Sequence, residues 1–209
     1  MAGQGLRELK KARTRQLIAD VAAQLFADRG YEHVAVSDVA REAEVSEQTV
    51  YNYFPSKERL VIDRDQQVQD QLVDLIRVRA PGVSAAAAVR EYLLASVDTI
   101  PTIPPEIWRG ELGYLAVMSP TVHRLLLEMT DRQADAIAAA ISDTTPVTAE
   151  VAKLQGIAIA SVFQIIFNHA GRRTHEGHSQ KDIADELHPT IETVLDELDR
   201  WLSLSERQR

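Results

Sequence analysis

Cysteine is absent from this 209-residue chain, which excludes a disulfide framework and thiolate chemistry. No apolar stretch is long enough to predict a bilayer crossing, and the charged N-terminus lacks the apolar run of a signal peptide. Alternating strand patterns are missing, as are G-x-S-x-G, P-loop and dinucleotide-binding motifs. We therefore expect an all-α, cytoplasmic protein that has no membrane segment, no cofactor and no enzymatic activity.

Charge is distributed unevenly along a chain whose net charge is −8. The first 60 residues balance 9 basic against 9 acidic side chains, so the remainder carries the whole excess of acid. Within the first 15 residues, five basic side chains face only one acid, Glu8. A basic arm beside an acidic body would orient the molecule on DNA, because the body repels phosphate. The alternative is a basic tail that is simply solvated.

Apolar residues recur at helical spacing, and the pattern predicts about nine helices. Gly30 ends the first helix, while Ser37, Ser46 and Ser56 are expected as N-caps of the next three. Pro- and Gly-containing segments separate the others. The later helices are expected at about 56–79, 84–99, 105–117, 120–142, 147–170 and 181–204.

The segment "SEQTVYNYF", residues 46–54, predicts a short helix with a polar face. On a helical wheel Val50 and Phe54 fall together and define the buried side, with Asn52 nearly opposite. Gln48 and Thr49 lie beside Asn52, and the two tyrosines flank this polar stripe. Asn and Gln bind adenine bidentately in the major groove, whereas tyrosine hydroxyls suit phosphate.

Two short helices precede residue 55, and the second carries this exposed polar stripe. Such a pair, joined by about three residues, is typical of a helix-turn-helix. Ser56 and Lys57 follow at the expected start of the fourth helix, where free N–H groups and an ammonium suit an anion. The alternative is an ordinary helical corner with a solvated face.

Residues 17–61 resemble the DNA-binding domain of TetR-family transcriptional regulators. The pieces that match in order are "LFADRGY", "VSDVAREA", "VS..TVYNYF" and "SKE.L". The resemblance implies a helix-turn-helix domain at 1–55 and a ligand-binding and dimerisation bundle at 56–209. It implies base contacts from the third helix and backbone contacts around it. The implied base contacts are Gln48, Thr49, Tyr51 and Asn52, and the implied backbone contacts are Ser37, Ser46, Tyr53 and Lys57.

Two residues depart from what the resemblance leads us to expect. Glu44 stands at the turn, where similar proteins usually have glycine; a positive φ there would cost a non-glycine residue about 1 kcal/mol. Glu47 places an acid on the first turn of the third helix. It either accepts a bond from cytosine N4 or complements the helix dipole, and the second role is the commoner one.

The last two predicted helices favour a homodimer. Residues 151–170, "VAKLQGIAIASVFQIIFNHA", are apolar on more than one face, which is typical of a helix buried on both sides. Paired with the final helix, this segment would form a four-helix interface around a two-fold axis. The alternative is a monomer with a thick core. Pro189 is expected either to kink the final helix or to mark the start of its main segment.

An effector pocket is harder to locate from the sequence. Several bulky residues mixed with a few polar ones have the composition of ligand sites, although each also fits a packed core. The candidates are Trp108, Tyr114, Met118, His123, Phe163, Gln164, Phe167 and Asn168. A metal site at "HEGH", residues 175–178, is not favoured, because zinc needs three or four fixed ligands.

The favoured interpretation is a ligand-responsive regulator, most simply a repressor, that binds double-stranded operator DNA as a homodimer and is released by an unidentified small molecule. One alternative is a helical small-molecule carrier or enzyme with a vestigial DNA-binding motif. Another is a DNA-binding activator or architectural protein with no effector.

Replacing Asn52 and Lys57 separately should distinguish base reading from phosphate contact. Asn52→Ala should weaken specific binding by about 1–3 kcal/mol, whereas Lys57→Ala should weaken binding to all sequences alike. Fluorescence anisotropy on specific and random duplexes measures both effects. Equal losses on the two duplexes for both variants would refute this division of roles.

Overall fold

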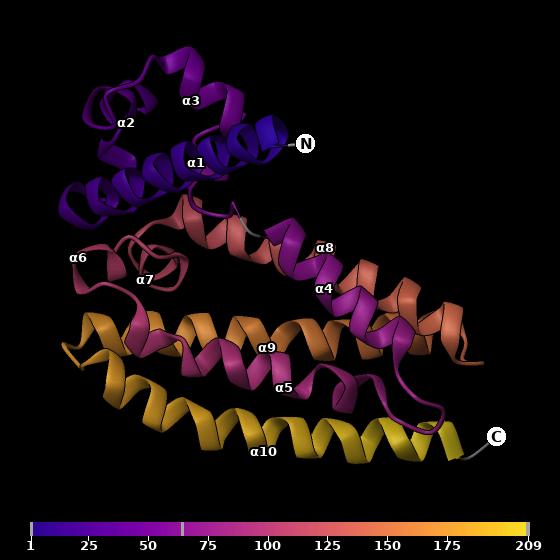
Figure 1. Cartoon of the computed structure of the whole chain (residues 1–209). Helices are drawn as coiled ribbons and strands as arrows, with labels where there is room; N and C mark the ends of the chain where they lie inside the picture. The colour runs from indigo at the N-terminus through magenta and orange to yellow at the C-terminus, as the bar shows by residue number, and fades with distance from the viewer. Residues whose placement is uncertain (1, 64, 208–209) are drawn as a thin grey trace.

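The computed structural model describes residues 2–63 and 65–207, and over this range it contains ten α-helices, three short 3-10 helices and no strand. Helices α1–α3 form one end of the molecule, and the remaining helices form a bundle beneath them (Figure 1). The α-helices are α1 (Ala2–Arg29), α2 (Val36–Glu42), α3 (Glu47–Tyr53), α4 (Asp65–Val78), α5 (Ala85–Asp98), α6 (Pro105–Trp108), α7 (Leu112–Met118), α8 (Pro120–Thr144), α9 (Ala149–His175) and α10 (Gln180–Arg207). The 3-10 helices are Tyr31–His33, Glu58–Leu60 and Ile100–Thr102.

The predicted all-α class is confirmed, and so are most helix positions. Gly30 follows α1 as predicted, with φ 79°, a positive φ that glycine adopts without a steric penalty. Ser46 caps α3 as predicted. Ser37, in contrast, is not the cap of α2: that helix begins at Val36, and the carboxylate of Asp38 reaches back to the N–H of Ala35 at 2.9 Å.

The turn between α2 and α3 keeps a left-handed residue without glycine. Glu44 has φ 54°, and it is the one non-glycine residue with positive φ in the part of the chain that the structure describes. The condition under which a cost was expected at this turn is therefore met. The strain, on the order of 1 kcal/mol, is small beside the burial of Val39, Ala43 and Val50 around the turn.

The predicted fourth helix, 56–79, is wrong in its first turns. Residues Glu58–Leu60 form a 3-10 helix, and α4 begins only at Asp65. Ile62 is buried with the N-terminal core, which takes the chain off the path of a continuous helix. The buried carboxylate of Asp65 then accepts bonds from Arg59 at 2.6 Å and from Arg132 of α8 at 2.9 Å. Long-range contacts therefore set where α4 starts.

The predicted helix at 105–117 is also two helices, α6 and α7, which is why the structure has ten helices instead of about nine. Gly110 lies in the break between them, against α1. A Cβ atom on Gly110 would lie 1.8 Å from the carbonyl oxygen of Ala23, so only glycine allows this approach. The break brings α6 against the first helix of the DNA-binding end (Figure 1).

Two apolar clusters make up the core. One joins α1–α3 and Ile62 to α7 and the first half of α8; the other fills the bundle of α4, α5, α8, α9 and α10. Leu60 and Ile62 belong to the first cluster. The division of the chain at residues 55 and 56 stays a prediction.

Helix α9 corrects the expectation that no segment is apolar enough to cross a membrane. Its length and composition would allow a crossing, but 44% of its most apolar window is buried, and it packs against α7, α8 and α10. It is a core helix of the bundle. It also continues to His175, five residues beyond the expected end at residue 170.

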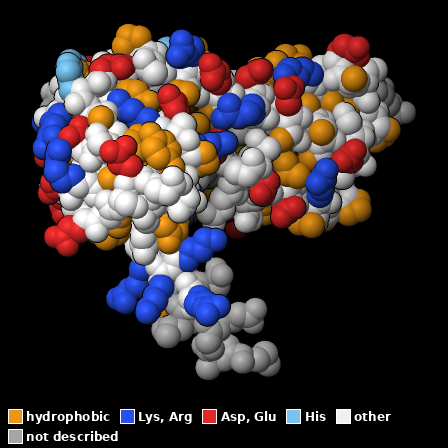
Figure 2. Space-filling view, turned by 90° about the horizontal axis from the view of Figure 1, so that it is seen from above, with side chains coloured by type: hydrophobic (Ala, Val, Ile, Leu, Met, Phe, Trp, Pro, Cys, Tyr) orange, Lys and Arg blue, Asp and Glu red, His pale blue; other side chains and the backbone are white. Residues whose placement is uncertain are grey.

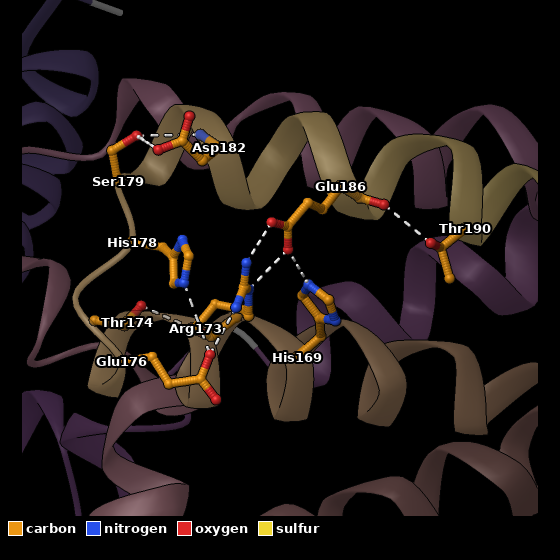
Figure 3. A network of polar contacts seen from close by, with 10 residues as sticks. His169, Arg173, Thr174, Glu176, His178, Ser179, Asp182, Glu186 and Thr190 are labelled. Carbon is orange, nitrogen blue, oxygen red and sulfur yellow. Dashed lines mark hydrogen bonds and ion pairs between the residues drawn. The ribbon is translucent and has the colours of Figure 1, made fainter.

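Helix α10 runs through Pro189 without a break, so the prediction that its main segment starts after the proline is wrong. Its N-terminal half is tied to α9 by a polar network (Figure 3). Arg173 donates from Nε to Glu186 at 2.8 Å and from NH1 to Glu176 at 2.7 Å, and the imidazole of His169 lies 3.1 Å from the same carboxylate of Glu186. The Arg173 guanidinium lowers the pKa of Glu186 to about 2.

This network predicts an acid-sensitive contribution to stability. Because the pKa of Glu186 is lower when folded than its ordinary value of 4.5, the contribution is complete above about pH 4.5 and is lost as pH falls towards 2. Glu186→Gln should lower stability at neutral pH and flatten its decline in acid. Urea unfolding at several pH values measures this. Glu91→Gln, at an exposed site on α5, is the control. If the free energy of unfolding of Glu186→Gln falls with decreasing pH as steeply as that of the wild type, Glu186 does not make the acid-sensitive contribution.

Candidate nucleic-acid interface

Helix α3 is held by two buried side chains, and its opposite face is exposed. Val50 and Phe54 are 0% and 1% exposed, as the helical wheel predicts. Gln48 and Asn52 are exposed, and Tyr51 is 43% exposed. A seven-residue helix is too short to be stable alone, so this packing determines which side chains face solvent.

The two exposed amides of α3 are joined to each other. Gln48 donates from Nε2 to Oδ1 of Asn52 at 3.1 Å. This bond fixes the Asn52 amide with its NH2 group free to donate, and it leaves the second lone pair of Oδ1 available. A donor beside an acceptor is the pattern that binds N7 and N6 of adenine.

The start of α3 is fixed by its own cap. Ser46 accepts a bond from the Thr49 N–H at 3.1 Å, and its hydroxyl lies 2.8 Å from that of Thr49. Ser46 is exposed and Thr49 is half-buried. Both hydroxyls can form further hydrogen bonds with DNA, but Thr49 is less exposed to solvent than Gln48.

Arg15, which the sequence did not single out as a positioning residue, fixes the end of α3. Its guanidinium lies 4.4 Å from the centre of the Phe54 ring, and it donates to the carbonyl of Tyr53 at 2.9 Å. Tyr53 itself is half-buried. No local signal could reveal this contact, because 38 residues separate its two partners.

Lys57 was expected in the first turn of a long helix, but that helix, α4, begins only at Asp65. The Nζ of Lys57 donates to the backbone carbonyl of Tyr31 and lies 4.0 Å from the centre of the Tyr31 ring. Burial lowers the pKa of the Lys57 ammonium. The ammonium therefore braces the segment after α1. Its contact with phosphate stays a prediction.

The basic N-terminal segment is helical, not a separate arm. Four of its basic side chains, Arg7, Lys10, Lys11 and Arg13, are exposed. They lie within residues 7–13 of α1, and Figure 2 shows a group of Lys and Arg side chains on the part that projects from the body of the molecule. Ser37 is also exposed, on the first turn of α2. These groups belong to α1 and α2, which form one end of the molecule together with α3 (Figure 1).

The residues predicted for an effector pocket lie in different environments. Met118 and His123 are exposed, whereas Phe163 is buried and its ring lies 6.1 Å from that of Phe167. Trp108 donates from Nε1 to Thr174 at 2.9 Å. The half-buried members are Trp108, Tyr114, Gln164, Phe167 and Asn168.

The structure contains a cavity that none of these predicted pocket residues lines. An open cavity of about 490 Å³ lies between the α4–α5 and α8–α9 connections, lined by residues 77, 79–83 and 144–147. Among the described residues there is no group of three or more His, Asp or Glu side chains that could hold a metal ion.

Comparison with known proteins places residues 18–63 in a family model described as "Bacterial regulatory proteins, tetR family". The chain is 32% identical over 87 residues to the HTH-type transcriptional regulator TcmR of Streptomyces glaucescens, covering 42% of this chain and 38% of that protein. It is 34% identical over 83 residues to the HTH-type transcriptional regulator BetI of Agrobacterium fabrum, covering 40% and 39%. The chain thus spans under two fifths of these curated relatives.

Among solved structures, the fatty acid degradation regulator FadR from Bacillus halodurans matches with a TM-score of 0.51 and 15% identity. The match covers 85% of this chain and 94% of that one. At this identity the likeness shows the fold, which extends over the C-terminal bundle as well as α1–α3.

A double-mutant cycle should reveal the coupling of the two amides of α3. If Gln48 orients Asn52 for base contact, the losses in DNA affinity caused by Gln48→Ala and Asn52→Ala should not add, with a coupling energy of about 0.5–3 kcal/mol. Anisotropy titrations of both single variants and the double variant measure it. Losses that add within 0.5 kcal/mol, as expected of independent sites, would contradict the role assigned to the Gln48–Asn52 bond.

Proposed function

Because the chain is a member of the TetR family of transcriptional regulators, and not an enzyme, we propose that it acts in the cytoplasm as a homodimeric repressor of transcription that binds operator DNA. A small-molecule effector bound in the C-terminal bundle releases it. The observation that carries the proposal is the orientation of α3, whose amide and phenol groups face solvent while Val50 and Phe54 are buried.

Base reading is assigned to Gln48, Thr49, Tyr51 and Asn52 of α3, placed in the major groove. The predicted phosphate contacts and the exposed basic side chains of α1 belong to α1, α2, α3 and the segment after α3, and α1–α3 form one end of the molecule (Figure 1). Two copies would read half-sites about one helical turn, ~34–36 Å, apart or somewhat more. The phosphate contacts are Ser37, Ser46, Tyr53 and Lys57.

The homodimer is supported by an apolar stripe on α9. Leu154, Ile157 and Ile165 are 54%, 42% and 40% exposed, and they recur at helical spacing on the solvent side of a core helix. Helix α10 contributes less than expected. Its Ile183, Leu187 and Ile191 face its own bundle at 0% exposure, and Trp201 is the exposed large apolar residue among the α10 side chains that the structure describes. We place α9 at the centre of the interface and α10 at its edge.

Communication between effector and DNA is supported by contacts that join the two ends of the molecule. The carboxylate of Asp65, the first residue of α4, accepts hydrogen bonds from Arg59, in the segment that follows α3, and from Arg132 of α8 in the bundle. Ser119, the cap of α8, donates to Glu32 at 2.6 Å, and this bond lowers the pKa of Glu32. An effector that favours one arrangement of α4 and α8 would change the distance between the α3 helices of the two copies in the dimer.

Disrupting the α9 stripe should test the dimer and the DNA function together. Ile157→Glu places a charge in the proposed interface, so we expect a monomer in sedimentation velocity. Binding to duplexes selected from a random pool should fall by at least about 100-fold, because two linked half-sites are lost.

Ala95→Glu, which adds the same charge at an exposed site on α5, is the control and should leave both properties unchanged. A dimeric Ile157→Glu would contradict the interface. A wild-type chain that shows neither duplex binding nor a salt dependence would contradict the proposed function.

A further inference from the structure

Two glutamines are buried in the apolar core of the C-terminal bundle, and one amide atom of each lacks a hydrogen-bond partner. Gln133 of α8 and Gln155 of α9 are 2% and 1% exposed. Oε1 of Gln133 and Nε2 of Gln155 have no hydrogen-bond partner among the residues that the structure describes. One orphan is an acceptor and the other is a donor. Buried polar atoms of this kind are rare and costly, so each requires an explanation.

The two glutamines project from the same side of one helix pair. Helices α8 and α9 run antiparallel and touch where Gly156 meets Ala134: a Cβ atom on Gly156 would lie 2.4 Å from the Ala134 carbonyl oxygen. Gln133 and Gln155 each immediately precede one of these contact residues. In an antiparallel pair, the positions before the contact turn to one side and the positions after it to the other.

Exposure confirms this geometry and identifies the side. The residues after the contact, Asp135 and Ile157, are both exposed. The glutamines therefore face the interior, where the same apolar cluster includes Leu72 and Ile76 of α4 and Val89 and Leu93 of α5. Side chains of glutamine length, projecting on one side of a close helix contact, come within reach of a single small molecule.

We propose that Gln133 and Gln155 form the polar end of the effector site, which rests on the proposed function of a ligand-responsive regulator. The effector presents a hydrogen-bond donor to Gln133 Oε1 and an adjacent acceptor to Gln155 Nε2, on a mainly apolar body. Amides, lactams and protonated carboxylic acids have this pattern. The site distinguishes them from ketones and hydrocarbons of the same shape, because those leave one or both amides unpaired.

Occupation of this site would act directly on α4. Gln133 and Gln155 are enclosed, so a ligand reaches them only by displacing the packing around them. Leu72 and Ile76 of α4 are both 0% exposed in that packing, and Asp65 at the start of α4 connects to Arg59 near the reading head. Displacement of α4 is therefore coupled to the position of the DNA-binding end.

The free protein provides the first test. If the amides are unsatisfied without ligand, Gln133→Met and Gln155→Met should each raise Tm by roughly 2–6 °C, since methionine has a similar shape and no polar group to bury. Gln71→Met, at an exposed site on α4, should leave Tm unchanged. A lower Tm in either core variant would show that the amides bond each other or a buried water, and would overturn the proposal.

Matched ring compounds provide the second test. ε-Caprolactam carries a donor beside an acceptor, and cycloheptanone has the same ring size with an acceptor alone. At millimolar concentration, caprolactam should raise the Tm of the wild-type protein and shift the side-chain amide resonances of Gln133 and Gln155. Cycloheptanone should have clearly smaller effects, and Gln155→Met should lose the caprolactam response. Equal responses to the two compounds, or no response to caprolactam, would overturn the assigned ligand class.

These readouts do not involve DNA, so the two hypotheses fail separately. Binding of caprolactam with no duplex binding would remove the proposed regulator and leave the ligand site. Duplex binding that responds to other molecules, with no caprolactam response at the glutamines, would remove the site and leave the regulator.

Discussion

The reading face of this protein depends on the burial of Val50 and Phe54. Helix α3 has only seven residues and cannot maintain its structure by backbone hydrogen bonds alone. Two apolar side chains one turn apart attach it to α1 and α2, and Arg15 fixes its end through the Tyr53 carbonyl and the Phe54 ring. With those positions occupied, Gln48, Tyr51 and Asn52 have no side to occupy except the outer one.

The two ends of the molecule are joined by the apolar cluster that runs from α1–α3 into α7 and the first half of α8, and by a few specific contacts beside it. Gly110 allows α1 and the α6–α7 break to touch, Ser119 binds Glu32, and Asp65 connects the start of α4 to both ends. The Asp65 carboxylate is buried and has two arginine partners, so loss of one partner would leave a poorly compensated buried charge. This arrangement favours movement of α4 and α8 as units over independent bending.

The α8–α9 pair presents opposite chemistry on its two sides. The inner side carries Gln133 and Gln155, two amides in an apolar core, whereas the outer side carries the exposed Ile157 together with the charged Asp135. Each side is unfavourable for an isolated chain in water, the first because polar groups are unpaired and the second because apolar surface is exposed. The proposed ligand on the inner side and the proposed second copy on the outer side would relieve both costs.

Features whose cause lies within one or two helical turns were determined by the sequence alone: the Ser46 cap, the Gly30 end of α1 and the buried side of α3. The tertiary structure decided the start of α4, the break between α6 and α7, the brace of Lys57 on Tyr31, and the inward side of Gln133 and Gln155. Caps, turns and amphipathic periodicity act between near neighbours, so a local pattern records them. The second set depends on partners many residues away, and only the packed chain brings those partners together.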